Sequence, residues 1–305
     1  MKKRTVTTQG MLQGTTRVSR GQVWLKYASN RSALLGIVIL SFFIILAVLA
    51  PIIARHAPFR IVAKGLQPPN LAYPMGTDDL GRDILSGFLF GSRVSISVGL
   101  TAALFSIAIG ILVGSVSGFL GGSIDDLFMR GTDFFIMLPR FFLAMFLATI
   151  FGTEIYITIV IIGVLSWPGT ARLVRSRFLS LKEKEFVQSA RAIGASNFLL
   201  IFREILPNAI SPAIVNGSLE VGNAILLEAG LSFLGFGDPN NPSWGFMLSI
   251  AQHFLSIAWW MAVFPGIGIF LTILAANLVG EGINEMTEPK SREWRRGGPI
   301  GKQTT

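Results

Sequence analysis

Six long apolar stretches constrain the fold of this chain more than any other feature of its sequence. Each covers about 20 residues, the length of an α-helix that crosses a bilayer core about 30 Å thick. The sequence therefore predicts an all-α integral membrane protein with six transmembrane helices. They lie at approximately residues 33–54, 94–119, 134–151, 155–175, 213–236 and 257–279.

The composition agrees with a membrane protein and excludes several other classes. Of the 305 residues, 51% are hydrophobic and only 14% are charged, which is unusual for a soluble domain. The net charge of +9 raises the alternative of nucleic-acid binding, but the extended polar surface that such binding needs is missing, so no nucleic acid is expected. Without cysteine there is no disulfide framework or thiolate site, and His56 and His253 leave little for a metal site.

The basic residues predict how the helices cross the membrane. The first 32 residues carry seven Lys or Arg and no Asp or Glu, which places the N-terminus in the cytoplasm. Six crossings then return the C-terminus to the cytoplasm. The stretch from Arg172 to Asn208 also holds seven basic residues and falls on the same side. The first apolar stretch is expected to be a retained helix, since it is longer than a signal-peptide core and follows a long N-terminal segment.

These crossings divide the chain into five expected parts. A basic cytoplasmic tail (1–32) precedes the first transmembrane helix (33–54) and an extracytoplasmic loop (55–92). A core transmembrane domain (93–280) follows, with a cytoplasmic loop at 176–210 inside it, and a cytoplasmic tail (281–305) ends the chain.

The cytoplasmic loop contains a patterned segment, EFVQSARAIGASNFLLIFREILPN, at residues 185–208. Ser180 to Glu183 resembles a capping box that starts a short helix, which Gly194 then breaks. Ser196 or Asn197 can cap a second short helix, and Pro207 is expected to stop it. Two short amphipathic helices around a glycine predict a compact knob. From the residues alone, a docking element and a basic helix lying on anionic lipid are both open.

Several further segments carry a family resemblance. The loop is similar to the coupling signature of ABC importer permeases, with departures at Gln188, Ser189 and Glu204. The segments MGTDDLGRDILSGFLFGSRVSISVGL (75–100), GFLGGSIDDLFMRGTDFFIMLPR (118–140), EAGLSFLGFG (228–237) and PSWGFML (242–248) resemble the C-type permease of the dipeptide/oligopeptide/nickel transporter family. The resemblance covers roughly residues 24–290, and the tail GEGINEMTEPK (280–290) departs from the family pattern.

The resemblance implies a type I ABC importer permease fold in a prokaryotic plasma (inner) membrane. The implied partners are a homologous second permease subunit, two cytoplasmic ABC ATPase subunits, an extracytoplasmic solute-binding protein and membrane lipid. The chain has no phosphate-binding loop, so ATP and Mg would be bound by the ATPases, with no cofactor and no catalytic site in this chain. Peptides are the expected cargo, with oligosaccharide, nickel or another solute as alternatives.

The resemblance also implies which residues dock on an ATPase. Gly194 would permit the bend of the knob, and Glu185 and Arg191 would make polar contacts at its rim. The full expected docking set is Glu185, Ala190, Arg191, Gly194, Ala195, Leu206 and Pro207.

Two carboxylates within the fifth predicted helix are candidates for the translocation path. An ionisable group at membrane depth is a functional-site hypothesis by default, and Glu220 and Glu228 are both such groups. Their eight-residue spacing lets both face one side of the bundle. The alternative is a structural tether between helices, which is favoured for Glu228 and left open for Glu220.

Three other functional interpretations of the sequence are disfavoured. Gly235 to Asp238 reads G-x-G-D, as in intramembrane aspartyl proteases, but no second aspartate is expected to face Asp238. Asp78, Asp79, Arg82 and Asp83 are expected to form caps and ion pairs rather than a metal site, with Thr77 able to cap a helix. A secondary transporter is disfavoured because the two halves of the chain show no internal repeat.

The second predicted helix carries glycines at or near four-residue spacing. Such a pattern is typical of close packing against another helix. The glycines concerned are Gly110, Gly114, Gly118, Gly121 and Gly122.

Overall fold

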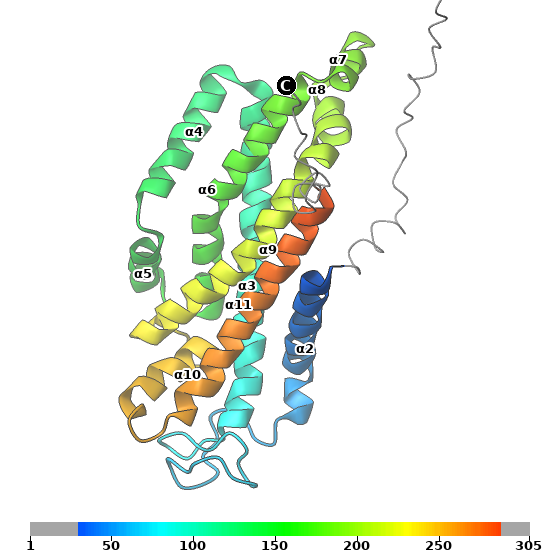
Figure 1. The fold of residues 1–305 in the computed structure, drawn as a ribbon. Helices are drawn as coiled ribbons and strands as arrows, with labels where there is room; N and C mark the ends of the chain where they lie inside the picture. The colour runs from blue at the N-terminus through cyan, green and yellow to red at the C-terminus, as the bar shows by residue number, and fades with distance from the viewer. Residues whose placement is uncertain (1–29, 288–305) are drawn as a thin grey trace, which may run out of the picture.

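The computed structural model describes residues 30–287, and these form a helical bundle with two isolated β-bridges in the 54–83 loop (Figure 1). The expectations for residues 1–29 and 288–305 lie outside this range. The helices that build the bundle are α2 (Arg31–Ile53), α3 (Ile84–Leu120), α4 (Gly122–Met137), α5 (Arg140–Phe151), α6 (Ile155–Lys182), α9 (Leu206–Leu231) and α11 (Trp260–Thr287). Shorter elements are α7 (Glu185–Ala192), α8 (Asn197–Leu199), η1 (Leu200–Ile205), η2 (Ser232–Phe236), α10 (Trp244–Ala251) and η3 (Gln252–Phe254).

Four long helices, α3, α6, α9 and α11, run side by side through the bundle, and α2 packs on α3 and α11 (Figure 1). Five helical segments are long and apolar enough to cross a membrane, or six if α4 and α5 together make one crossing. Asn30 at the start of α2 donates a hydrogen bond to Glu285 near the end of α11, 2.8 Å away. The first and last described helices therefore begin and end on the same side of the bundle.

The predicted third span, 134–151, is not one continuous helix, and Pro139 within it stands at the break, as expected of a proline that kinks a helix. The structure divides it between α4 and α5, which are bent by 88° relative to each other. Leu138 has an extended backbone, and Pro139 has no amide hydrogen to continue the helical ladder. The last predicted helix is also longer than expected, because α11 continues past residue 279 to Thr287 and includes the first residues of the expected C-terminal tail.

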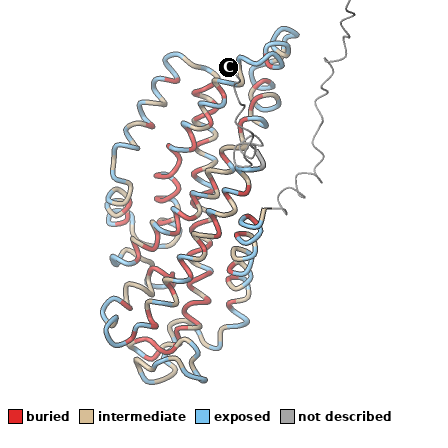
Figure 2. The backbone as a smooth tube through the Cα atoms, in the orientation of Figure 1, coloured by how far each residue is buried: buried red, intermediate tan, exposed pale blue. Residues whose placement is uncertain are grey.

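The bundle core lies along α3, where buried residues run the length of the helix (Figure 2). At one end of the core, the fully buried Trp244 of α10 stacks on Phe88 and meets Phe43 edge-on. The indole Nε1 donates to the carbonyl of Phe88 at 3.1 Å, so the polar edge of this ring is satisfied inside the core. The segment 242–248 is therefore an integral part of the bundle, although its sequence lies in an expected outer loop.

The glycines of α3 confirm the predicted close helix packing, and their partner is α6. A Cβ atom on Gly114 would lie 2.5 Å from the carbonyl oxygen of Ala171. Equivalent atoms on Gly110 and Gly118 would lie 2.5 Å from Thr170 and 2.6 Å from Phe178. Gly121 and Gly122 do not belong to this interface: both have positive φ and form the turn between α3 and α4.

We expect Gly114→Ala to destabilise the chain by roughly 1–3 kcal/mol, since the backbone of α6 leaves no room for a methyl group. Gly131→Ala is the matched control, because Gly131 is exposed on α4 and nothing lies within 4 Å of its Cβ position. This control should be neutral or stabilising by up to about 1 kcal/mol. Unfolding of the purified variants in detergent measures both, and equal stabilities would contradict the packing assigned to Gly114.

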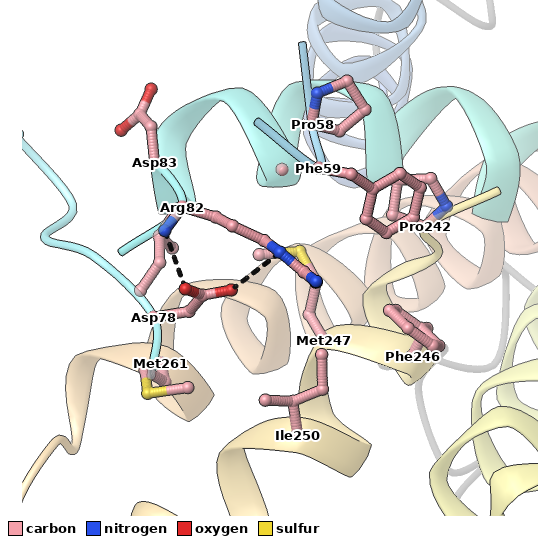
Figure 3. Close-up of a pocket in the computed structure, with 12 residues that line it drawn as sticks. Pro58, Phe59, Asp78, Arg82, Asp83, Pro242, Phe246, Met247, Ile250 and Met261 are labelled. Carbon is pink, nitrogen blue, oxygen red and sulfur yellow. Dashed lines mark hydrogen bonds and ion pairs between the residues drawn. The ribbon is translucent and has the colours of Figure 1, made fainter. Parts of the chain in front are cut away.

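The 54–83 loop is fixed against the end of the bundle that carries α10. Arg82 makes an ion pair with Asp78, with Nε and Oδ2 3.9 Å apart, and its guanidinium lies over the ring of Phe59 (Figure 3). Burial is the main influence on Asp78 and raises the pKa of this carboxyl above its ordinary value, against hydrogen bonds from the backbone of Arg82 and Leu80. The ring of Phe59 also meets Phe246 of α10 edge-on, with centroids 6.2 Å apart, so the loop packs on α10.

The expected helix cap is confirmed for Asp83 and wrong for Thr77. Asp83 is the N-cap and accepts from the amides of Leu85 and Ser86 at 3.3 and 3.1 Å. Thr77 instead lies buried in the loop, where its hydroxyl accepts from Gln67 and donates to Lys64. Between residues 30 and 287, no three His, Cys, Asp or Glu side chains are grouped as metal ligands.

Candidate functional site

The expected knob is present as a two-helix element between α6 and α9, here called the knob (residues 185–205). It projects from the bundle at the end opposite α10 (Figure 1). The predicted capping box is wrong: Ser180 lies inside α6, which continues to Lys182, and α7 begins at Glu185 after Lys184. Phe178, fully buried in the packed base of the knob, holds this part of α6 helical beyond the predicted end of the span.

The bend of the knob is a glycine-terminated helix end, as predicted for Gly194. Gly194 has φ +88° and ends α7 in the left-handed region that favours glycine. The amide of Ala195 donates to the carbonyl of Ala190 at 3.1 Å, and that of Gly194 donates to Arg191 at 3.0 Å. This pair of bonds is a Schellman motif. Four residues of the expected docking set thus form one rigid turn.

The second helix of the knob begins at the predicted cap, since Ser196 accepts a hydrogen bond from the amide of Leu199 at 3.4 Å. Its expected end is wrong. Pro207 is the second residue of α9, directly after a π-helical turn, and helical structure continues through it from Asn197 to Phe236. A π-helical segment, Leu200–Ile205, joins α8 to α9. The knob is therefore continuous with a transmembrane helix.

A small apolar core fixes the base of the knob on α6. Val187 of α7 is fully buried with Val174 and Phe178 of α6 and with Leu200 and Ile205 of η1. A displacement of the knob must then act on both α6 and α9. This is the property that a mechanical coupling element needs.

The outer surface of the knob combines exposed apolar and charged residues. Ile193 is 87% exposed at the bend, and the rings of Phe198 and Phe202 lie exposed with centroids 4.6 Å apart. Glu185 in the first turn of α7 and Arg191 in its last turn suit the helix dipole and are exposed. Leu206 and Pro207 lie at the start of α9, where Pro207 is exposed. An apolar tip rimmed by charges is typical of a protein-binding surface.

The two candidate carboxylates of α9 are buried and engaged in the bundle. Arg140 of α5 donates to Glu220 at 3.0 Å and also to Ser166 of α6, so Arg140 links α5 to both α9 and α6. Ser232 donates to Oε1 of Glu228 at 2.6 Å, while Oε2 has no partner among the described residues. Neither carboxylate lines the cavity of about 340 Å³ between α6, α9 and α11 that is described below.

Two further ion pairs attach α4 to α6, and sequence reasoning missed both. Asp125 accepts two hydrogen bonds from Arg175, each 2.5 Å long, and a third from Ser117. One helical turn away on α6, Arg172 pairs with Asp133. The sequence shows acids at residues 125–133 and arginines at residues 172–175. Which acid meets which arginine depends on how α4 and α6 pack.

Asp238, the aspartate of the G-x-G-D pattern, is a loop residue with structural partners. It accepts hydrogen bonds from the amides of Ile155 and Asn240 and from the side chain of Asn241. Partial burial would raise the pKa of Asp238, but these hydrogen bonds dominate and lower it below its ordinary value. An ionised carboxylate with this set of donors holds the start of α6 to the loop that follows η2.

The apolar bundle, the buried polar links and the projecting knob describe a multi-pass membrane protein. Comparison with known proteins agrees. Residues 106–293 match the model of the binding-protein-dependent transport system inner membrane component, and residues 20–69 match the N-terminal transmembrane domain of oligopeptide transport permease C. The chain belongs to this family of inner-membrane transport components and is a multi-pass protein of the plasma membrane.

Several curated relatives cover nearly the whole chain. The dipeptide transport system permease protein DppC of Alkalihalophilus pseudofirmus is 36% identical over 86% of this chain and 87% of its own length. A putative peptide permease protein of Brucella suis is 37% identical over 87% of this chain and 89% of its own. The oligopeptide transport system permease protein OppC of Bacillus subtilis is 35% identical, with 88% and 89% covered. Membership of this family implies that the chain works in a transporter complex.

Proposed function

We propose that this chain is one of two membrane subunits of an ATP-driven, binding-protein-dependent importer of di- or oligopeptides. It forms half of the translocation path, beside a homologous second permease. The knob, continued by Leu206 and Pro207, docks on one of two cytoplasmic ATPase subunits, which bind ATP and Mg. The observation that carries this proposal is the rigid attachment of the knob to both α6 and α9.

The arrangement of the ends supports a cytoplasmic location for both termini. The start of α2 and the end of α11 meet through Asn30 and Glu285. The segment from Arg172 to Asn208, which includes the knob, carries seven basic residues, as cytoplasmic segments do. The 54–83 loop and α10 then face outward, where a solute-binding protein delivers its cargo. In this proposal Glu220 and Glu228 act as tethers that hold the wall of the path.

The peptide substrate follows from the relatives, which are named as dipeptide and oligopeptide permeases. Uptake of labelled dipeptides and longer peptides by a strain that lacks this chain tests it. We expect peptide uptake to be lost and then restored when the chain is supplied. Unchanged peptide uptake, with loss of nickel or oligosaccharide uptake instead, would contradict the peptide assignment and support the alternative cargo.

A further inference from the structure

The asparagines of the bundle helices are confined to two neighbouring helices. Helix α9 contains Asn208, Asn216 and Asn223, and α11 contains Asn277 and Asn284, whereas α2, α3, α4, α5 and α6 contain none. Asn216 and Asn223 are seven residues apart, as are Asn277 and Asn284. Seven residues make almost two helical turns, so each pair lies on one face of its helix. These five side chains are called the asparagine track below.

The two halves of the track lie against each other because α9 and α11 are packed and antiparallel (Figure 1). Gly222 directly precedes Asn223 in α9. A Cβ atom on Gly222 would lie 3.8 Å from Oδ1 of Asn277 in α11. At the end of the bundle that carries the knob, Asn208, Asn216 and Asn284 line one cavity of about 340 Å³. This volume is in the range of small-molecule binding pockets. The track therefore runs from this cavity toward the middle of the bundle.

The track is open rather than buried in the core. Asn208, Asn223, Asn277 and Asn284 are exposed, and Asn216 is half-buried with its Nδ2 donating to Thr170 at 3.0 Å. From Asn208 to Asn223 the helix rises about 22 Å, most of the thickness of a bilayer core. Polar side chains at that depth face a protein interior or a water-filled cavity rather than lipid. This face of α9 and α11 is therefore directed toward a protein interior or a water-filled cavity, and not toward lipid.

The wall of the cavity combines neutral hydrogen-bonding side chains with one cation, because Arg177 of α6 lines it together with Asn208, Ser211, Asn216 and Asn284. Ser211 and Pro212 lie between Asn208 and Asn216 on the same face of α9. Pro212 has no amide hydrogen to donate to the carbonyl of Asn208, four residues earlier, so α9 is locally weakened beside the cavity. By contrast, Glu220 and Glu228 are directed into bonds with Arg140 and Ser232.

We propose that the asparagine track is this chain's half of the surface along which a peptide moves, with the amide side chains bonding the peptide backbone. This inference rests on the proposed peptide-importer function. A side-chain amide both donates and accepts, as a backbone peptide group does, so one row of asparagines matches an extended peptide of any sequence. An uncharged side-chain amide also holds a peptide group less strongly than a charged side chain would, so the peptide can pass from one asparagine to the next.

The absence of cysteine from the sequence provides the test. Single Asn216→Cys and Asn223→Cys variants are assembled with the second permease, the ATPases and the binding protein, and exposed to a charged, membrane-impermeant thiol reagent. Any label on this subunit then marks the introduced residue. Ile214→Cys is the matched control, because Ile214 is exposed on α9 about 200° around the helix from Asn216.

We expect the thiol reagent to label both track variants during ATP turnover. Saturating peptide should slow this labelling severalfold. Labelled transporter should no longer take up peptide, although its ATPases stay bound. Ile214→Cys should remain unlabelled. The track is overturned if the unmodified transporter imports peptide but neither track variant reacts with the reagent. It is also overturned if peptide does not change the rate of labelling. If the unmodified transporter imports no peptide, the proposed function itself fails.

Discussion

Gly194→Asp abolishes ATP-driven transport while leaving the chain inserted in the membrane. The left-handed conformation at Gly194 costs any other residue roughly 1–2 kcal/mol, and relaxing this strain opens the Schellman turn that joins Ala190 to Ala195. The added side chain also projects from an open surface, since nothing lies within 4 Å of its Cβ position. It would therefore enter the space of a docked ATPase. We expect loss of ATPase co-purification with normal amounts of the chain in the membrane fraction.

Gly122→Asp is the matched control for this variant. Gly122 is exposed, has φ +56° and has no atom within 4 Å of its Cβ position, but it lies in the turn between α3 and α4. Backbone strain and an added charge are thus the same in both variants. Co-purification should survive in Gly122→Asp. Equal loss in both variants, or normal co-purification of Gly194→Asp, would refute the docking role of the knob.

Arg140→Leu has the largest expected effect on stability. Removing Arg140 leaves Glu220, whose side chain is only 11% exposed, without its cation. Breaking a buried ion pair from one side costs 3–5 kcal/mol, and we expect roughly 3 kcal/mol here because the Arg140 side chain is 37% exposed. Unfolding of the purified chain in detergent measures the loss.

Two further variants separate this explanation from a general loss of charge. Arg140→Leu with Glu220→Leu removes both partners and should regain most of the lost stability, because no unpaired charge is left. Arg172→Leu breaks a pair in which both side chains are 49% exposed, so it should cost no more than about 1 kcal/mol. A double variant as unstable as Arg140→Leu alone would show that the ion pair is not the source of the effect.

The parts of the fold that local sequence controls were predicted well. Apolar length located the long helices, and the four-residue spacing of Gly110, Gly114 and Gly118 predicted a helix interface that α6 completes. Gly194 was predicted to break the first short helix of the loop, and Ser196 or Asn197 to cap the second, because backbone conformation and capping depend on the residue itself and its neighbours.

The errors arose where packing overrides a local signal. Ser180 has the sequence of a cap, but Phe178 is buried in the base of the knob and α6 continues through it. Pro207 was expected to end a helix, although proline is equally suited to a helix start. Pro139 predicted a kink within residues 134–151, but the local sequence could not give the 88° angle between α4 and α5.

The sequence could not reveal which charges meet. Arg140 and Glu220 are 80 residues apart, and Asp125 and Arg175 are 50 apart. Their pairing depends on helix positions that no local pattern encodes. For the same reason Glu220 stood out as a lone intramembrane carboxylate, and only its neighbours show that Arg140 links it to α5 and α6.

The most direct test of the account is peptide uptake by proteoliposomes that contain this chain, the second permease and the ATPases, with the binding protein on the outer side. Uptake should require ATP at the knob side and the ATPases, and should be independent of an imposed ion gradient. Uptake that an ion gradient drives without the ATPases would contradict the account, because the chain would then be a secondary transporter.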